Sequence, residues 1–279
     1  MDMTNLLRAG PNLVLADVDT TATPGFKNDK VAGVKALANG ATTLFDLQER
    51  LFAESRFGGT RSLLLVVQAM DAAGKGGIVQ HVGGQITPEG LKVFGFKAPT
   101  DEEKQHDFLW RIRRQVPPAG YVGIFDRSHY EDVLIARVHG FAPPEEIAAR
   151  YKAIVDFEQE LIAAGTTIIK VMLHVSLAEQ KIRLAARLDD PTKNWKYNPN
   201  DINERDFWPK YMEAYEIAIN RTSTESSPWY VVPADKKWYA RVAVQKLTID
   251  ALTGMKLGWP KVDYNVAAEK KRLAADPEK

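Results

Sequence analysis

The residues best suited to chemistry lie in one glycine-rich stretch, Asp71–Gly77, with the sequence DAAGKGG. The apolar run 63–67 before it predicts a strand buried on both faces of a parallel sheet, and the residues after it are compatible with a helix. A strand, a glycine-rich turn and a helix in this order aim free backbone N–H groups at an anion. Lys75 adds a mobile cation, so the stretch predicts a phosphate-binding loop. Its expected phosphate contacts are Ala72, Ala73, Gly74, Lys75, Gly76 and Gly77.

This loop departs from the usual pattern, G-x-x-x-x-G-K-[ST], in which the hydroxyl after the lysine holds Mg²⁺. Ala69 stands at the first position and Gly76 replaces the hydroxyl residue. The lost metal ligand needs a substitute, and Asp71 inside the loop is the nearest candidate. The alternative interpretation is a tight strand-to-helix turn in which the glycines serve packing and Lys75 is solvated.

A second acidic residue, Asp126, comes directly after the apolar run 121–125, where enzymes with such loops hold their metal ion. Ligands of open α/β sheets bind beyond the carboxyl ends of the strands, so Asp71 and Asp126 are expected to converge there. Two carboxylates beside a phosphate require a cation, and we predict that both bind Mg²⁺. Asp126 as a helix N-cap is the alternative. His129 is expected to be packed or hydrogen-bonded rather than catalytic.

A basic segment follows the strand predicted at 167–175. Ser176 and Glu179 form a capping signature, and Arg183 and Arg187 are four residues apart, so both project from one helix face. A polar loop with Lys193 and Lys196 comes next, and then a helix to about residue 220. A mobile basic segment between two strands is how loop-containing kinases cover the transferred phosphoryl group, so we predict a lid at about 180–220. A solvated pair of charged helices is the alternative.

The remaining patterns predict elements that position these residues. Arg111, Arg113 and Arg114 are expected on an exposed helix surface, and a substrate role for one of them is the alternative. Residues 1–60 form an extension whose helix, over 30–52, carries Val31, Val34 and further apolar residues at helical spacing and packs on the core or on a neighbouring subunit. Residues 61–260 form the core, and 261–279 form a charged tail that is expected to fray. Further strands are expected at 91–96 and 229–232, and further helices at 74–85, 100–115, 145–164 and 235–252.

Bulk properties exclude several classes of protein. The 279 residues include no cysteine, which excludes disulfides and thiolate metal sites and makes the cytoplasm the default location. No apolar run approaches the about 18 residues of a membrane span, and no signal-peptide pattern opens the chain. The formal net charge is only +1, so we expect neither nucleic acid nor a membrane as a partner, and any polyanion must meet a local basic cluster.

These residues together closely resemble one family, polyphosphate kinase 2. The resemblance rests on QAMDAAGKGG at 68–77, FDRSHYEDVL at 125–134 and RLAARLDDPTKNWKY at 183–197, and covers nearly all of 40–260. It implies a three-layer α/β kinase core similar to thymidylate kinase, with a parallel sheet, flanking helices and a helical lid. It also implies reversible, Mg²⁺-dependent phosphoryl transfer between inorganic polyphosphate and adenine or guanine nucleotides, in a homo-oligomer (dimer or tetramer). The absent Ser or Thr after Lys75 is the family's own pattern.

The resemblance also assigns roles to single residues. Asp71 and Asp126 would bind the metal, and Arg127, Arg183 and Arg187 would steady the transferring or chain phosphates, with Lys193 and Lys196 of the lid beside them. The motif FDRSHYEDV, rather than FNRSWYNRA, looks like the subgroup that accepts both AMP and ADP. Two alternatives stay open: an ATP-dependent nucleoside monophosphate kinase of the thymidylate kinase type, and a protein that binds polyanions or nucleotides without turnover.

Overall fold

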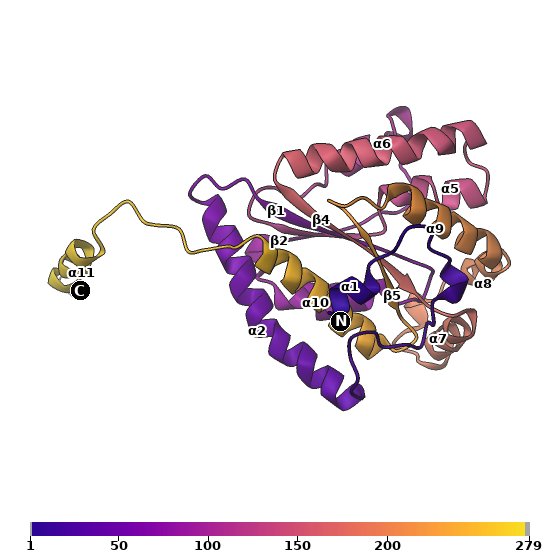
Figure 1. The fold of residues 1–279 in the computed structure, drawn as a ribbon, viewed down its shortest axis with the longest axis horizontal. Coiled ribbons are helices and arrows are strands. Elements are labelled where there is room, and N and C mark those ends of the chain that lie inside the picture. Colours follow the sequence, from indigo (N-terminus) through magenta and orange to yellow (C-terminus); the bar gives the residue numbers. More distant parts are fainter. Residues whose placement is uncertain (1, 277–279) are drawn as a thin grey trace.

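A parallel sheet of five strands forms the centre of the molecule, as expected for the α/β class (Figure 1). The computed structural model describes residues 2–276. The strands stand in the order β2-β3-β1-β4-β5, and every neighbouring pair is parallel. All residues of β1 are buried, because helices cover both faces of the sheet. The strands are β1 Ser62–Ala69, β2 Leu91–Gly95, β3 Val122–Asp126, β4 Thr166–His174 and β5 Trp229–Pro233.

Helices form a layer on each side of the sheet, which confirms the predicted three-layer fold (Figure 1). One layer contains α2 (Lys30–Ser55) and α10 (Lys237–Gly254), and the short α1 (Met3–Leu7) and α3 (Lys75–His81) pack against α10. The opposite layer contains α6 (Pro144–Ala163), α9 (Trp208–Thr222) and α5 (Ile135–Val138). Short 3₁₀ helices connect the elements: η1 Leu15–Asp17, η2 Gly83–Gln85, η3 Pro88–Gly90, η4 Glu103–Gln105, η5 His129–Asp132 and η6 Asn194–Lys196.

The α2 helix packs on α10 through a face that the apolar pattern only partly predicts. Leu44 is fully buried, but Val31 and Val34 are 78% and 55% exposed. The close approach in the first half of the helix uses glycines instead: a Cβ on Gly33 would lie 2.3 Å from the Trp238 ring. The expectation of a helix packed on the core is therefore correct, whereas the expected buried stripe is wrong at its start.

The helix predicted over 100–115 is also wrong in its extent. Its capping box forms, because Thr100 and Glu103 exchange side-chain-to-backbone hydrogen bonds at 2.9 and 3.2 Å. Only the 3₁₀ turn η4 follows, since the side chain and carbonyl of Asp107 accept the amides of Leu109 and Trp110 and start a new turn. This turn is α4 (Trp110–Arg113). The expectation that Arg111 is exposed is wrong, because its side chain is buried.

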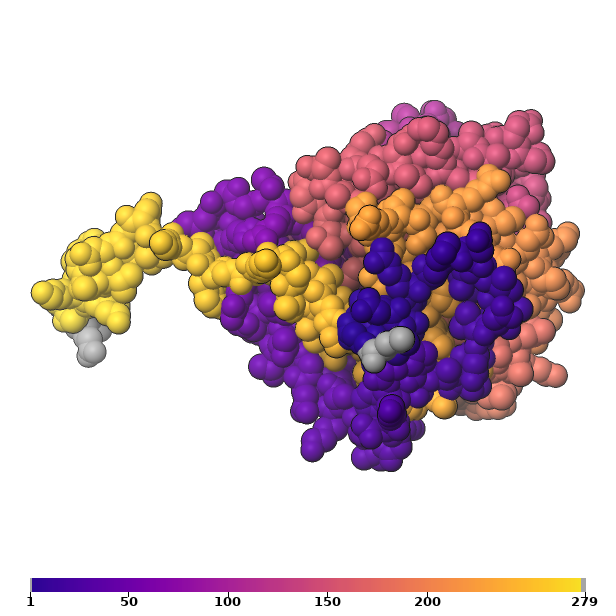
Figure 2. Space-filling view, in the orientation of Figure 1, coloured from indigo at the N-terminus to yellow at the C-terminus, as the bar shows by residue number. Residues whose placement is uncertain are grey.

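The predicted lid consists of α7 (Leu177–Asp189), the turn η6 and α8 (Asn200–Arg205). At the other end of the molecule the chain leaves the body after α10 and runs outward to α11 (Val266–Ala275), which stands clear of the core (Figure 2). Every residue of α11 is exposed, and the segment is a helix rather than the frayed tail that was expected. Residues 277–279 of that tail lie outside the described residues. Within 2–276 no helix is long and apolar enough to cross a membrane.

Candidate active site

One cavity of about 590 Å³ at the carboxyl end of the sheet brings together every site residue predicted from the sequence. The loop after β1, the end of β3 and the predicted lid all contribute to its walls. The predicted residues that line it are Asp71, Ala72, Ala73, Gly74, Lys75, Gly76, Gly77, Asp126, Arg127, Arg183, Arg187, Lys193 and Lys196. Their roles stay predictions, but their convergence is the arrangement that those roles require.

The glycine-rich loop presents free backbone donors to this cavity. Ala72 has a left-handed φ of 60° and Gly74 a φ of 125°, which turn the chain back on itself before α3 begins at Lys75. Among the described residues, the amides of Ala72, Gly74, Lys75 and Gly76 have no intramolecular acceptor. Lys75 Nζ is held by the loop itself and donates to the carbonyl of Ala69 at 2.8 Å. Free amides beside a lysine form a site for phosphate oxygens.

The two predicted carboxylates, Asp71 and Asp126, lie at the ends of the neighbouring strands β1 and β3. Arg127 follows Asp126 directly. Arg127 has a left-handed φ of 64°, its amide donates to Val67, and its Nη2 donates to Asp71 Oδ1 at 2.9 Å. Burial raises the pKa of Asp71, but the positive charges of Lys75 and Arg127 outweigh it and leave that pKa below its ordinary value. Asp71 is thus an anion at neutral pH. An arginine in such a backbone conformation is typical of functional sites.

These two carboxylates fit a magnesium ion. The Asp126 carboxylate makes no hydrogen bond or ion pair with residues 2–276, although its backbone carbonyl accepts from Phe96, and Oδ2 of Asp71 is likewise without a protein partner there. Mg²⁺ is usually bound by one or two carboxylates together with substrate phosphates and water, rather than by a cage of protein ligands. The described part of the chain holds no cluster of three or more acidic or histidine side chains placed for a metal.

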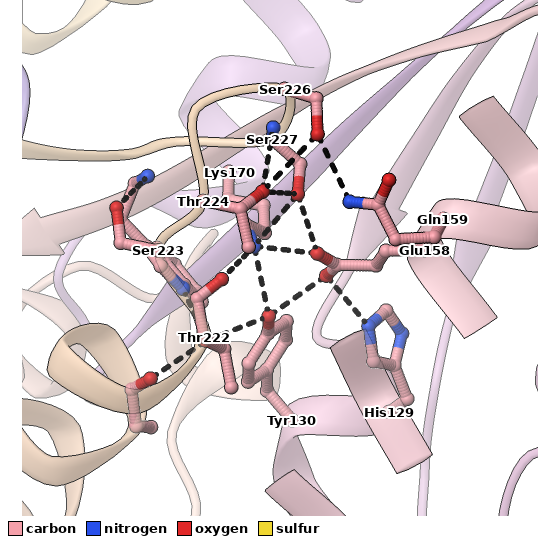
Figure 3. A network of polar contacts seen from close by, with 12 residues as sticks. His129, Tyr130, Glu158, Gln159, Lys170, Thr222, Ser223, Thr224, Ser226 and Ser227 are labelled. Carbon is pink, nitrogen blue, oxygen red and sulfur yellow. Dashed lines mark hydrogen bonds and ion pairs between the residues drawn. The ribbon is translucent and has the colours of Figure 1, made fainter. Parts of the chain in front are cut away.

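A buried polar network lies beneath the turn that follows Arg127 (Figure 3). Lys170 of β4 donates to Glu158 of α6 at 2.6 Å and to the carbonyl of Thr222 at 2.7 Å. The other oxygen of Glu158 accepts from the Tyr130 hydroxyl at 2.8 Å and contacts His129 at 3.3 Å. All four side chains of this network are at most 1% exposed. The packed role predicted for His129 is confirmed, and the network anchors η5 directly after the Asp126-Arg127 pair.

Burial alone would make this network costly, and the charges within it offset that cost. Desolvation raises the pKa of Glu158, but Lys170 and His129 oppose it and hold that pKa below its ordinary value. Desolvation and Glu158 together raise the pKa of the Tyr130 hydroxyl well above its ordinary value, so Tyr130 remains a neutral donor. The network is therefore a hydrogen-bonded ion pair, in which His129 Nδ1 alone among these four side chains is buried without a partner in the described part of the chain.

The lid arginines behave differently from each other. Arg187 Nη1 donates to the carbonyl of Lys196 at 3.0 Å and lies 3.4 Å from Asp201, so it stays at the cavity wall with free donors. Lys193 pairs with Asp190 on the outer part of the lid. Arg183 is 4% exposed and binds protein groups with its whole guanidinium.

Two cations of this cavity were not predicted from the sequence. Lys237 and Arg241 lie in the first turns of α10 and line the cavity, and a Cβ on Gly77 of the loop would lie 3.6 Å from Arg241 Nη2. Burial lowers the pKa of both, and the nearby Arg183 lowers each further. The available signal was a basic pair four residues apart directly after the predicted last strand, at the same edge of the sheet as the loop.

A second cavity, of about 980 Å³, adjoins the first, and Arg127 lines both. Its walls include three phenylalanines, Phe96, Phe108 and Phe141, from separate segments of the chain. Arg111 also lines it and lies 3.6 Å from Asp132, which places a polar pair beside the aromatic rings. Apolar walls with few polar groups are typical of sites for small organic molecules.

Comparison with known proteins agrees with this geometry. The profile of a family described as polyphosphate kinase 2 matches residues 27–258. The AMP/ADP-polyphosphate phosphotransferase of Meiothermus ruber is 44% identical over 252 residues, which are 90% of this chain and 92% of the relative. The ADP-polyphosphate phosphotransferase of Rhodopseudomonas palustris is 45% identical over 229 residues, 78% of each protein.

A solved structure extends the similarity to three dimensions. The crystal structure of polyphosphate kinase 2 from Arthrobacter aurescens is 56% identical to this chain, with a TM-score of 0.97. The match covers 99% of this chain and 98% of the other. The resemblance inferred from the three motifs is thereby confirmed, and the chain belongs to the polyphosphate kinase 2 family.

Proposed function

We propose that this protein transfers the terminal phosphoryl group of inorganic polyphosphate to AMP and ADP, reversibly and with Mg²⁺. The observation that carries the proposal is the pair of adjoining cavities with Arg127 in the wall of both. One is rich in cations and free amides, as a polyphosphate requires, and the other is aromatic, as a nucleoside requires. The donor and the acceptor phosphate meet where Arg127 and Asp71 lie.

The polyphosphate binds in the first cavity. Its chain phosphates contact the free amides of the loop and a set of cations from the loop, the end of β3, the lid and α10. This local basic cluster explains how a protein with a net charge of +1 holds a polyanion. The proposed cations are Lys75, Arg127, Arg187, Lys193, Lys196, Lys237 and Arg241.

The nucleotide binds in the second cavity with its phosphate toward Arg127. Its base stacks on the aromatic walls, and we choose Phe108 for this contact because it is partly buried, whereas Phe96 is 3% exposed and Phe141, at 69%, is largely in solvent. The Meiothermus ruber relative is named for AMP and ADP and the Rhodopseudomonas palustris relative for ADP, and we extend both acceptors to this chain; guanine nucleotides bind in the same way.

The transfer step needs positioning and charge neutralisation rather than a base. An oxygen of the acceptor phosphate, already ionised at neutral pH, forms a bond to the terminal phosphorus, and the bridging oxygen leaves with the shortened polyphosphate. Lys75, Arg127 and Arg187 stabilise the charge on the transferring group. Asp71 and Asp126 would hold Mg²⁺, which would supply further neutralisation of the phosphate charge.

We further propose that the enzyme works in the cytoplasm as a homo-oligomer (dimer or tetramer) and binds no nucleic acid. The absence of cysteine and the near-neutral charge support the first and last points. Exposed apolar side chains outside the two cavities, among them Val31, Trp259 and Leu273, support contacts between subunits.

The test is an assay with AMP and polyphosphate in the absence of ATP, with AMP, ADP and ATP separated by chromatography. ADP followed by ATP, formed only when Mg²⁺ is present, is the expected result. ATP formed from ADP but no product from AMP would limit the acceptor to ADP. Turnover of AMP with ATP but not with polyphosphate would replace the proposal by an ATP-dependent nucleoside monophosphate kinase.

A further inference from the structure

Arg183, predicted from the sequence to bind phosphate, has no N–H group left to do so. Its Nε donates to Glu179 at 2.8 Å, and Nη1 donates to the carbonyls of Ala72 and Ala73 at 3.2 and 2.5 Å. Its Nη2 donates to the carbonyls of Ala234 and Asp235. A guanidinium has five N–H groups, and here five protein oxygens accept them.

A second residue of the same helix adds to this arrangement. Gln180, 1% exposed, donates through Nε2 to the carbonyl of Asp71 at 2.9 Å. Together with Arg183 it binds the carbonyl oxygens of three successive loop residues, Asp71, Ala72 and Ala73. These carbonyls point toward α7, which leaves the free amides of the loop for the phosphate side.

The loop needs such support. Ala72 is held at φ 60°, a conformation that is unfavourable for a residue with a side chain and that persists only where its surroundings fix it. Lys75 makes the other side-chain contacts to this turn, to the carbonyls of Ala69 and Met70 at 2.8 and 3.4 Å, both before Asp71. The bonds from α7 therefore hold the stretch 71–73, which Lys75 does not hold.

We propose that Arg183 and Gln180 are positioning residues that clamp the phosphate-binding loop to α7 and to the β5–α10 junction, and that Arg183 does not bind polyphosphate. This inference rests on the proposed function for its kinetic part only. The clamp joins the loop to the start of α10, where Lys237 and Arg241 face the same cavity. The clamp thereby sets the distance between Lys75 of the loop and the α10 cations Lys237 and Arg241.

The clamp also divides the predicted lid. Arg183 and Gln180 lie in the first half of α7 and are tied to the sheet, whereas Arg187, one turn further, has donors free at the cavity wall. The part of the lid that moves over the substrate begins after Arg183. Arg187 is the first residue of α7 that contacts polyphosphate.

The test compares Arg183→Lys and Arg183→Gln with Lys181→Ala, which removes an exposed positive charge from the same helix. A lysine keeps the charge but cannot bind four carbonyls and a carboxylate in one plane. Both Arg183 variants are expected to lower kcat by about 10- to 100-fold to a similar extent, with KM for polyphosphate changed by less than about threefold. Lys181→Ala is expected to behave as the wild type.

A binding measurement without nucleotide separates the clamp from a phosphate contact. The Kd of polyphosphate is measured over a series of salt concentrations, because each cation that neutralises a phosphate steepens the dependence of log Kd on log salt by about one. The slope is expected to be unchanged in Arg183→Gln and lower in Arg187→Ala. A lower slope in Arg183→Gln, or a normal kcat in Arg183→Lys, would overturn the proposal.

Gln180→Ala keeps the proposal testable where the Arg183 variants do not fold. It removes the bond to the loop and the bond that Gln180 Oε1 accepts from Arg205, and kcat of the folded variant is expected to fall at least about threefold; a normal kcat would contradict the clamp. Wild-type protein without polyphosphate-dependent turnover would overturn the proposed function instead, and the salt series would still decide between the two roles of Arg183.

Discussion

The buried ion pair beneath the active-site turn supports a prediction about stability. Lys170 and Glu158 are 0% and 1% exposed and lie 2.6 Å apart. Replacing Lys170 by Met leaves the Glu158 carboxylate without its cation in a site closed to water. Loss of one partner of such a pair costs about 3–5 kcal/mol of unfolding free energy. For a chain of 279 residues that corresponds to a melting temperature lower by roughly 5–9 °C.

A double-mutant cycle tests this reasoning, and its double variant removes the charges of both Lys170 and Glu158. In Lys170→Met with Glu158→Gln, the amide oxygen still accepts from the Tyr130 hydroxyl, and the amide nitrogen can donate to the Ser227 hydroxyl that Glu158 binds at 2.9 Å. The double variant is therefore expected to recover most of the loss and to unfold within about 1–2 kcal/mol of the wild type.

The interaction free energy between Lys170 and Glu158 is measured by urea unfolding at pH 7. The proteins compared are the wild type, both single variants and the double variant. A coupling of at least about 2 kcal/mol is expected, and turnover of the folded double variant should stay near that of the wild type, since none of these residues lines the phosphate cavity. Additive single costs, or a loss below about 1 kcal/mol for Lys170→Met, would refute the reasoning.

Three further predictions concern the two cavities. Arg187→Ala is expected to raise KM for polyphosphate and lower kcat by about 10-fold each, measured in the AMP assay; an unchanged rate profile would remove the lid from the mechanism. Burial lowers the pKa of Lys75 below its ordinary 10.5, although Asp71 opposes this, so kcat/KM should fall as pH rises through that lowered value. In Lys75→Arg the fall should move to higher pH, and a profile equal to that of the wild type would exclude Lys75 as its source. Phe108→Ala is expected to raise KM for AMP about 5- to 10-fold without changing KM for polyphosphate, and the reverse pattern would place the nucleotide elsewhere.

Much of the site could be predicted because it follows from local sequence and from one rule of topology. The order of strand, glycine-rich turn and helix can be predicted from one continuous stretch of residues around Lys75. Asp126 could be added because the carboxyl ends of parallel strands share one edge of a sheet. Both predictions need only the strand assignments, which long apolar runs make clear.

The rest depends on contacts between distant segments. The bonds of Arg183 to Ala234 and Asp235 join residues about fifty positions apart, and no spacing within α7 distinguishes it from Arg187. The buried face of α2 was misjudged because glycine, rather than an apolar side chain, allows the close approach of α10 at Gly33. An apolar pattern predicts which side chains are buried, but it does not predict where two helix backbones approach each other closely.

The most direct test of the central claim, that this cavity carries out polyphosphate-dependent phosphorylation, is the rate of ADP formation from AMP and polyphosphate in Lys75→Ala. The matched control is Lys181→Ala, and melting temperatures of both variants establish that they fold. The claim predicts a loss of kcat of about 100- to 1,000-fold in Lys75→Ala and a normal rate in the control, because Lys75 stabilises charge that develops on the transferring phosphoryl group. A folded Lys75→Ala variant with near-normal turnover would contradict the account.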